Sequence, residues 1–148
     1  MEFHHPVGCG RDRCETDHGP KPFVAHVVRA VRQNQNFRTA FWTGDHLQMT
    51  LMSIPVCSDI GLEIHSETDQ IIRIEQGMAL VKMGQRKNEL KFQMEVCKDD
   101  TIFVPAGTWH NVINIGRTPL KVSSIYAPPH HPAGTVHRTK EEAEAAHN

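Results

Sequence analysis

The segment Pro105-Ala106-Gly107-Thr108-Trp109-His110-Asn111-Val112-Ile113-Asn114 decides the fold class, because it joins a tight turn to the start of a strand. Its Pro-x-Gly element predicts a turn that ends one strand and begins the next. Side chains alternate between two faces along a strand. The turn is therefore expected to deliver His110 and Asn114 onto the same face as Val112.

Short strand-like runs continue on both sides of this segment. They lie at 37–42, 47–51, 62–65, 71–75, 78–83, 101–104, 112–115 and 120–126. Turn residues such as Gly77, Gly84 and Gly116 separate them, roughly every 8 to 12 residues. This pattern predicts an all-β fold, either a small β-barrel or a sandwich.

The two ends of the chain differ from the β-rich middle. Residues 1–22 are rich in Gly, Pro, His and charge, and predict a flexible or strap-like arm. Apolar residues at helical spacing over 23–34 predict a short amphipathic helix at the start of a domain spanning 23–136. A short helix is expected within 137–148, because Thr139 and Glu142 fit a capping box.

The composition excludes several classes of function. The chain has 148 residues and a formal net charge of −1, so nothing favours nucleic acid or an anionic membrane as a partner. No apolar run approaches the roughly 20 residues that span a bilayer. The first residues lack the basic and apolar regions of a secretory signal, so we expect a cytoplasmic protein.

Cysteine and histidine contents suggest weaker alternatives. Cys9 and Cys14, which have four residues between them, could form a zinc knuckle, but free thiols in a flexible terminal segment are favoured. The chain has 11 histidines, and most of those near its polar or proline-rich ends are expected to be solvated. These terminal histidines are His4, His5, His130, His131 and His147.

A polar row follows the turn-rich region around Gly61. Glu63, His65 and Glu67 alternate with Leu62 and Ile64, so the three polar side chains would share one strand face. Such a row on its own is usually an ordinary solvated strand face. Together with His110, this row could instead form one polar site. The alternative is that His65 and His110 are two independent histidines of the core.

The turn segment resembles the second motif of the cupin superfamily, which runs Gly, five residues, Pro-x-Gly, two residues, His, three residues, Asn. This chain matches it at Pro105, Gly107, His110 and Asn114, with Asp99 in place of the opening glycine. The resemblance covers roughly residues 45–127 and implies a single small barrel, a double-stranded β-helix or jelly roll.

The first cupin motif is more degenerate here. Counting back from Gly77 places Gln70 at the glutamate position, His65 at the second histidine and Glu63 at the first. Cys57 stands where the motif opens with glycine.

The resemblance implies one divalent metal inside the barrel, zinc, iron, manganese or nickel, held by Glu63, His65, Gln70 and His110. Gln70 is a neutral, weak ligand. Glu67 could replace Glu63 as a ligand if the register shifts, or could act as a catalytic base.

The resemblance favours a small-molecule-binding protein with a non-catalytic or sensing role. The alternative is a metal-dependent enzyme, either similar to sugar-phosphate isomerases or a small dioxygenase. A homodimer is also expected, because the apolar face of Leu62 and Ile64 would lie outside the barrel and need cover. The N-terminal arm is the other candidate cover.

Overall fold

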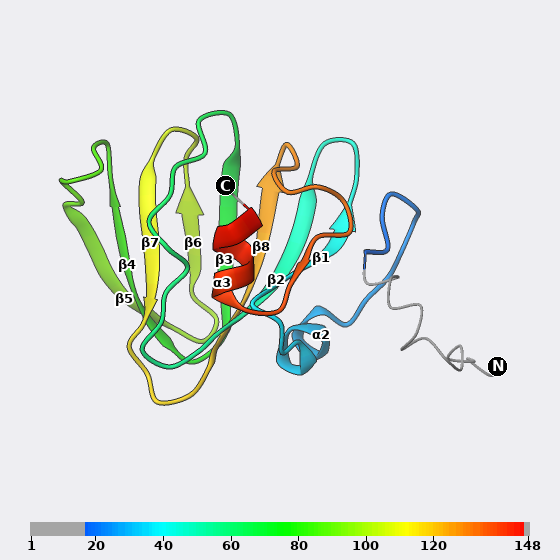
Figure 1. Cartoon of the computed structure of the whole chain (residues 1–148), viewed down its shortest axis with the longest axis horizontal. Coiled ribbons are helices and arrows are strands. Elements are labelled where there is room, and N and C mark those ends of the chain that lie inside the picture. The colour runs from blue at the N-terminus through cyan, green and yellow to red at the C-terminus, as the bar shows by residue number, and fades with distance from the viewer. Residues whose placement is uncertain (1–16, 147–148) are drawn as a thin grey trace.

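The chain folds into two antiparallel β-sheets in the computed structural model, which describes residues 17–146 (Figure 1). The larger sheet has six strands in the order β6-β3-β8-β2-β1-β9, and the smaller has three in the order β5-β4-β7. The strands are β1 (Arg38–Thr43), β2 (Gln48–Ile54), β3 (Asp69–Gln76), β4 (Met78–Gly84), β5 (Phe92–Cys97), β6 (Thr101–Val104), β7 (Trp109–Asn114), β8 (Leu120–Ala127) and β9 (Val136–His137). The all-β prediction is confirmed, with two sheets in place of one closed barrel.

The apolar core lies between the sheets. It is built from alternate residues of the central strands, as expected where one face of each strand is buried. Its members include Met52, Ile54, Ile72, Ile74, Val81, Val112, Leu120 and Val122. The core therefore fills one part of the space between the sheets with aliphatic side chains.

The remaining interior is polar. Gln48 and Thr50 of β2 are completely buried, although they are the polar members of an alternating strand. They pair with Tyr126 and Ser124 of β8, which are also buried. Burying polar side chains is costly unless they are hydrogen-bonded, so a polar interior of this kind points to a site and not to simple core packing.

Two short helices accompany the sheets. Helix α2 (Val27–Gln33) is shorter than the predicted 23–34, because His26 caps its start by accepting a hydrogen bond from the Arg29 amide at 3.2 Å. Helix α3 (Lys140–Ala146) begins as the capping box predicts. The Thr139 hydroxyl accepts from the Glu142 amide at 3.1 Å, and the Glu142 carboxylate accepts from the Arg138 amide at 2.9 Å.

The segment between β2 and β3 corrects the prediction of a strand over 62–65. Within residues 62–65 only Glu63 forms a β-bridge, with His110, through backbone hydrogen bonds of 3.0 and 2.9 Å. Gly61 takes a φ of +104°, which bends the chain just before the bridge. Leu62 and Ile64 thus do not form a regular apolar strand face. Instead, both line a cavity that α3 also borders.

Strands β5 and β9 were not predicted. β5 alternates Phe92, Met94 and Val96 with polar residues, which is a usable signal, but it is an edge strand and only Val96 is buried. β9 has two residues and exists only through its pairing with β1. A segment so short carries no periodicity.

Candidate metal centre

Three side chains from distant parts of the sequence converge at the polar end of the interior. They are Glu63 and His65, from the segment between β2 and β3, and His110, from β7. One potential ligand atom from each lies within 4.8 Å of the others. The Glu63–His110 bridge brings the two segments together, so the backbone itself sets this convergence.

His110 is oriented for coordination. Its ring is 1% exposed, and Nδ1 donates a hydrogen bond to the Thr108 carbonyl oxygen at 2.9 Å. Because a carbonyl can only accept, the proton of the neutral ring resides on Nδ1 and leaves a lone pair on Nε2. Nε2 has no hydrogen-bond partner and lies 3.7 Å from Oε1 of Glu63. Metal-binding histidines are typically oriented in this way.

The Glu63 carboxylate lies close to the imidazole rings of both His65 and His110. Its Oε1 lies 2.9 Å from Nε2 of His65. Burial alone would raise the pKa of Glu63, but the neighbouring imidazoles of His110 and His65 outweigh burial and lower the pKa well below its usual value. Glu63 is therefore a carboxylate at neutral pH, the form that a metal requires.

The other two predicted site residues lie outside this group of three. Gln70 is buried on β3, where its amide nitrogen is 3.4 Å from Oγ of Ser124 and its Oε1 has no hydrogen-bond partner. It faces the same polar interior. Glu67 lies on an exposed bend, so it is not part of a polar row with Glu63 and His65. The roles of Gln70 as ligand and Glu67 as base stay predictions.

His130 and His131 form a wall of the site, which sequence reasoning missed. The His130 ring centroid lies 4.0 Å from that of His65, and His131 is buried against Tyr126. Gln48 holds this segment by accepting from both backbone amides and donating to the His131 carbonyl. The expectation of a solvated side chain is therefore wrong for His131.

Burial and neighbouring positive charge keep His131 neutral. Burial is the larger cause, and the positive charge of Arg38 adds to it, so the pKa of His131 falls to about 2. The proline-rich stretch around these histidines packs over the site, where His130 lines the cavity. Its prolines could have signalled an ordered segment.

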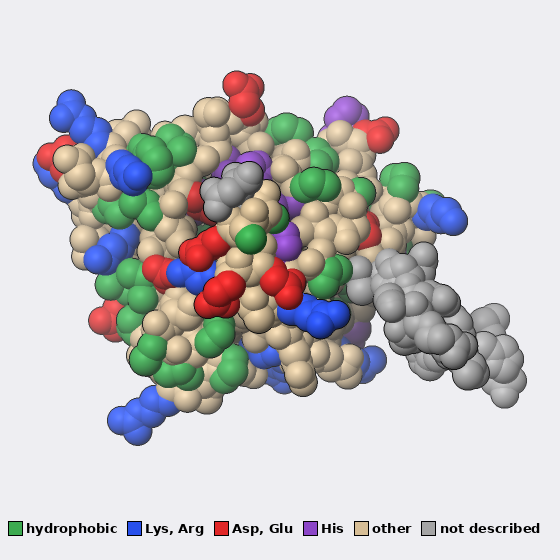
Figure 2. Space-filling model, in the orientation of Figure 1, with side chains coloured by type: hydrophobic (Ala, Val, Ile, Leu, Met, Phe, Trp, Pro, Cys, Tyr) green, Lys and Arg blue, Asp and Glu red, His purple; other side chains and the backbone are tan. Residues whose placement is uncertain are grey.

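A cavity of about 420 Å³ adjoins the centre. It is lined by Glu63, His65 and His130, by Arg38 of β1, and by Ala143 and neighbouring residues of α3. Lys140 ties α3 to Asp59 through an ion pair, which closes one side. The acidic side chains of α3 gather on this face of the molecule (Figure 2). A volume of this size suits a small molecule.

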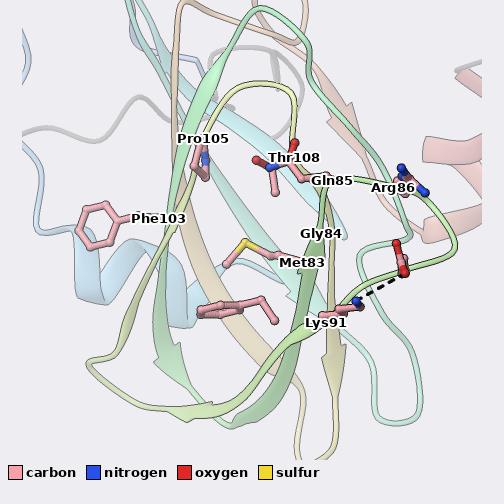
Figure 3. Close-up of a pocket in the computed structure, with 10 residues that line it drawn as sticks. Met83, Gly84, Gln85, Arg86, Lys91, Phe103, Pro105 and Thr108 are labelled. Carbon is pink, nitrogen blue, oxygen red and sulfur yellow. Dashed lines mark ion pairs between the residues drawn. The ribbon is translucent and has the colours of Figure 1, made fainter.

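A larger cavity of about 620 Å³ lies elsewhere, between β4 and β6 (Figure 3). Apolar side chains line it, among them Met83, Phe103 and Pro105. Its acid, Glu89, is engaged by Lys91 at 3.6 Å. None of the residues of the metal cluster lines it, so the smaller cavity is the better candidate for a functional site.

The donor set of the cluster fits a divalent transition metal. Two imidazoles and one carboxylate are the ligands that zinc, iron, manganese and nickel accept, and three protein ligands leave positions open for water or a small molecule. The unpartnered Nε2 of buried His110 supports the same assignment. The ligands would be Glu63, His65 and His110.

No helix among residues 17–146 is long and apolar enough to cross a membrane.

Comparison with known proteins agrees with the fold. The Bacillus subtilis protein YrkC, itself uncharacterized, is 63% identical over 130 residues, which cover 88% of this chain and 70% of YrkC. The crystal structure of BH2720 from Bacillus halodurans superimposes with a TM-score of 0.87 at 60% identity, covering 88% of this chain and 98% of that one. The structure of TT1209 from Thermus thermophilus superimposes with a TM-score of 0.60 at 18% identity. The superposition covers 71% of this chain and 96% of TT1209, so the two proteins share the fold.

The family model described as the cupin domain matches residues 50–126, which is more than half of the chain. The match includes Glu63, His65, Gln70 and His110, and it extends to Tyr126 at the end of β8. The chain therefore belongs to the cupin family.

Proposed function

We propose that this protein binds a divalent transition metal through Glu63, His65 and His110, and binds a small molecule in the adjoining cavity. The observation that carries the proposal is the orientation of His110. Its Nδ1 is committed to a backbone carbonyl, while its buried Nε2 has no hydrogen-bond partner and is directed at Glu63. A merely structural histidine would have both nitrogens satisfied.

The test is metal analysis of untagged protein. Zinc, iron, manganese and nickel are measured by mass spectrometry after purification and after loading with each metal. We expect close to one ion per chain for the wild-type protein and a loss of at least tenfold in affinity for His110→Ala. His46→Ala removes an exposed histidine from a turn and is the matched control. Equal metal contents in both variants would exclude the site.

A metal-dependent enzyme is the second candidate. The observation in its favour is that three protein ligands leave coordination positions open beside a cavity. Glu67, the predicted base, is exposed and lies outside the cluster of Glu63, His65 and His110, so we favour the binding or sensing role. Turnover of any sugar phosphate or small oxo-acid by the metal-loaded protein, lost in His110→Ala, would reverse this preference.

We also propose a cytoplasmic homodimer as the working form. The cytoplasmic location rests on the sequence argument given above. The dimer rests on exposed apolar side chains that need cover, and Phe103, Met94 and Phe92 are among the largest of them. Light scattering at micromolar concentration should give about twice the chain mass of 16.7 kDa. A mass equal to that of one chain would exclude the dimer.

A further inference from the structure

Arg38, on β1, is a buried cation that the proposed metal centre does not use. Its side chain is 2% exposed and lines the same 420 Å³ cavity as Glu63 and His65. A guanidinium stays charged at all physiological pH values. Buried charges in proteins are normally paired with an opposite charge, because an unpaired one is strongly destabilising.

The contacts of Arg38 within the protein are uncharged. Nη1 lies 3.4 Å from Nδ1 of His137, and Nη2 lies 4.0 Å from the sulfur of Met52. The guanidinium carbon stands 5.5 Å from the centre of the Phe37 ring, and Nε has no hydrogen-bond partner. Among residues 17–146, no carboxylate forms an ion pair with Arg38.

The acids that line the cavity are engaged elsewhere. The Glu63 carboxylate is hydrogen-bonded by His65, and it is the proposed metal ligand. Glu144 is largely exposed and lies 4.0 Å from Lys140. Metal binding would add further positive charge beside Arg38, so the filled site would attract an anion more strongly.

Two further buried polar atoms of the larger sheet have no hydrogen-bond partner, although their residues do not line the cavity. They are Oγ1 of Thr50 on β2 and Oε1 of Gln70 on β3. Among the described residues of the larger sheet, Nε of Arg38 is the unpartnered buried polar atom whose residue lines the cavity. Buried polar groups require partners, and a polar ligand can supply them.

We propose that the cavity binds a small carboxylate-bearing molecule, with Arg38 as the residue that binds the carboxylate. The proposal rests on the proposed function in one respect, namely that this cavity is the ligand pocket. A carboxylate matches the edge of one guanidinium through two parallel hydrogen bonds. A phosphate has three oxygens to satisfy, and Arg38 is the unpaired cation that the described residues place here.

The direct test follows the Arg38 Nε–H signal by NMR, assigned by its loss in Arg38→Lys. Pyruvate and glucuronate are titrated against their uncharged counterparts, methyl pyruvate and glucose, and against inorganic phosphate. We expect at least one carboxylate to shift the signal and its counterpart to leave it unchanged. The proposal is overturned if neither carboxylate shifts the signal or if the counterparts shift it equally. Tighter binding of phosphate than of both carboxylates would overturn the carboxylate assignment.

Calorimetry of variants gives a second readout. Arg38→Gln should weaken the binding of the carboxylate at least tenfold, and Arg38→Lys should weaken it less, because it keeps the charge. Arg117→Gln, at an exposed position, is the control and should bind as wild type. Unchanged affinity in a folded Arg38→Gln protein contradicts the proposal. If that variant fails to fold, the wild-type titrations decide alone.

Each titration is made with zinc-loaded and with metal-free protein, and metal content is measured in parallel. A protein that binds no metal but still shows the carboxylate shift at Arg38 would refute the metal centre and keep the anion site. A protein that holds metal but shows no shift would refute the anion site alone.

Discussion

At the scale of single residues, the site depends on which acid occupies the centre. Glu63 is held 2.9 Å from one histidine nitrogen and 3.7 Å from another, whereas Glu67 is exposed only four positions away. Both were plausible ligands from the sequence, because either could share a strand face with His65. The β-bridge with His110 selects Glu63, since it fixes the backbone at that residue.

Glu63→Gln should therefore weaken metal binding by about 100-fold, because the amide replaces an anionic ligand with a neutral one. Competition titration with a zinc-sensitive dye measures the change. Glu67→Gln is the matched control and should bind zinc as wild type. If Glu67→Gln loses zinc and Glu63→Gln retains it, Glu67 is the ligand instead.

The residues that the sequence could identify are those within a motif of fixed spacing. His110 follows the Pro-x-Gly turn, and its environment depends on local backbone geometry. Arg38 and His131 could not be found in this way. Their roles arise from neighbours far along the chain, such as His137 for Arg38 and Gln48 for His131, and sequence periodicity contains no information about such pairs.

At the scale of elements, Asp17 joins three segments. Its carboxylate accepts hydrogen bonds from the Thr43 amide at 3.0 Å, the Thr43 hydroxyl at 2.6 Å and the Gly134 amide at 2.8 Å. The end of β1 is thereby tied to the loop that carries the histidine wall. Burial alone would raise the pKa of Asp17, but these hydrogen bonds and one from Gly19 lower it.

Because the pKa of Asp17 is lower in the folded protein, its stabilisation is present above about pH 4 and is lost as the pH falls through the folded value. Asp17→Asn should reduce the free energy of unfolding by about 1 to 2 kcal/mol at pH 7. The difference from wild type should shrink at pH 3. Urea unfolding at both pH values measures it, with exposed Asp45→Asn as the control. An equal loss at both pH values would show that the carboxylate charge is not responsible.

Helix α3 packs on the molecule through Ala143, which is 3% exposed and belongs to the apolar core. Ala143→Asp would place a charge there, so we expect the protein to lose about 2 kcal/mol of stability, or α3 to detach from the cavity. Ala145→Asp, on the exposed side of the same helix, should have little effect. Thermal unfolding measures stability, and hydrogen exchange of the α3 amides reports detachment. Similar effects of both substitutions would contradict this docking.

Prediction of the elements succeeded where alternation coincided with burial and failed where it did not. The central strands alternate clearly and were located, whereas the segment around Gly61 alternates in sequence without forming a strand. There, two isolated bridges, of Asp59 with Ile113 and of Glu63 with His110, and a glycine with positive φ replace a regular ladder. The pattern of side chains was present, but the backbone pairing that makes a strand was not.

At the scale of the whole molecule, the two sheets are held together by apolar residues in one region and by the polar site in another. The proposed metal ligands come from the segment after β2 and from β7, which belongs to the smaller sheet. The remaining walls of the cavity come from the larger sheet and from α3. A ligand that binds here contacts parts of the chain that come together only in the folded state.

Metal binding should consequently stabilise the entire fold, because the ion binds the native state in preference to the unfolded chain. At a free zinc concentration about 100 times the dissociation constant, the gain is about 2.7 kcal/mol. For a chain of this length, that corresponds to a rise in Tm of about 8 °C. Scanning calorimetry with zinc and with excess chelator measures the difference. His110→Ala should show no such rise, and His46→Ala should show the full rise. A Tm of wild type that is unchanged by zinc would mean that these residues form a histidine–carboxylate cluster that contributes to folding without a metal.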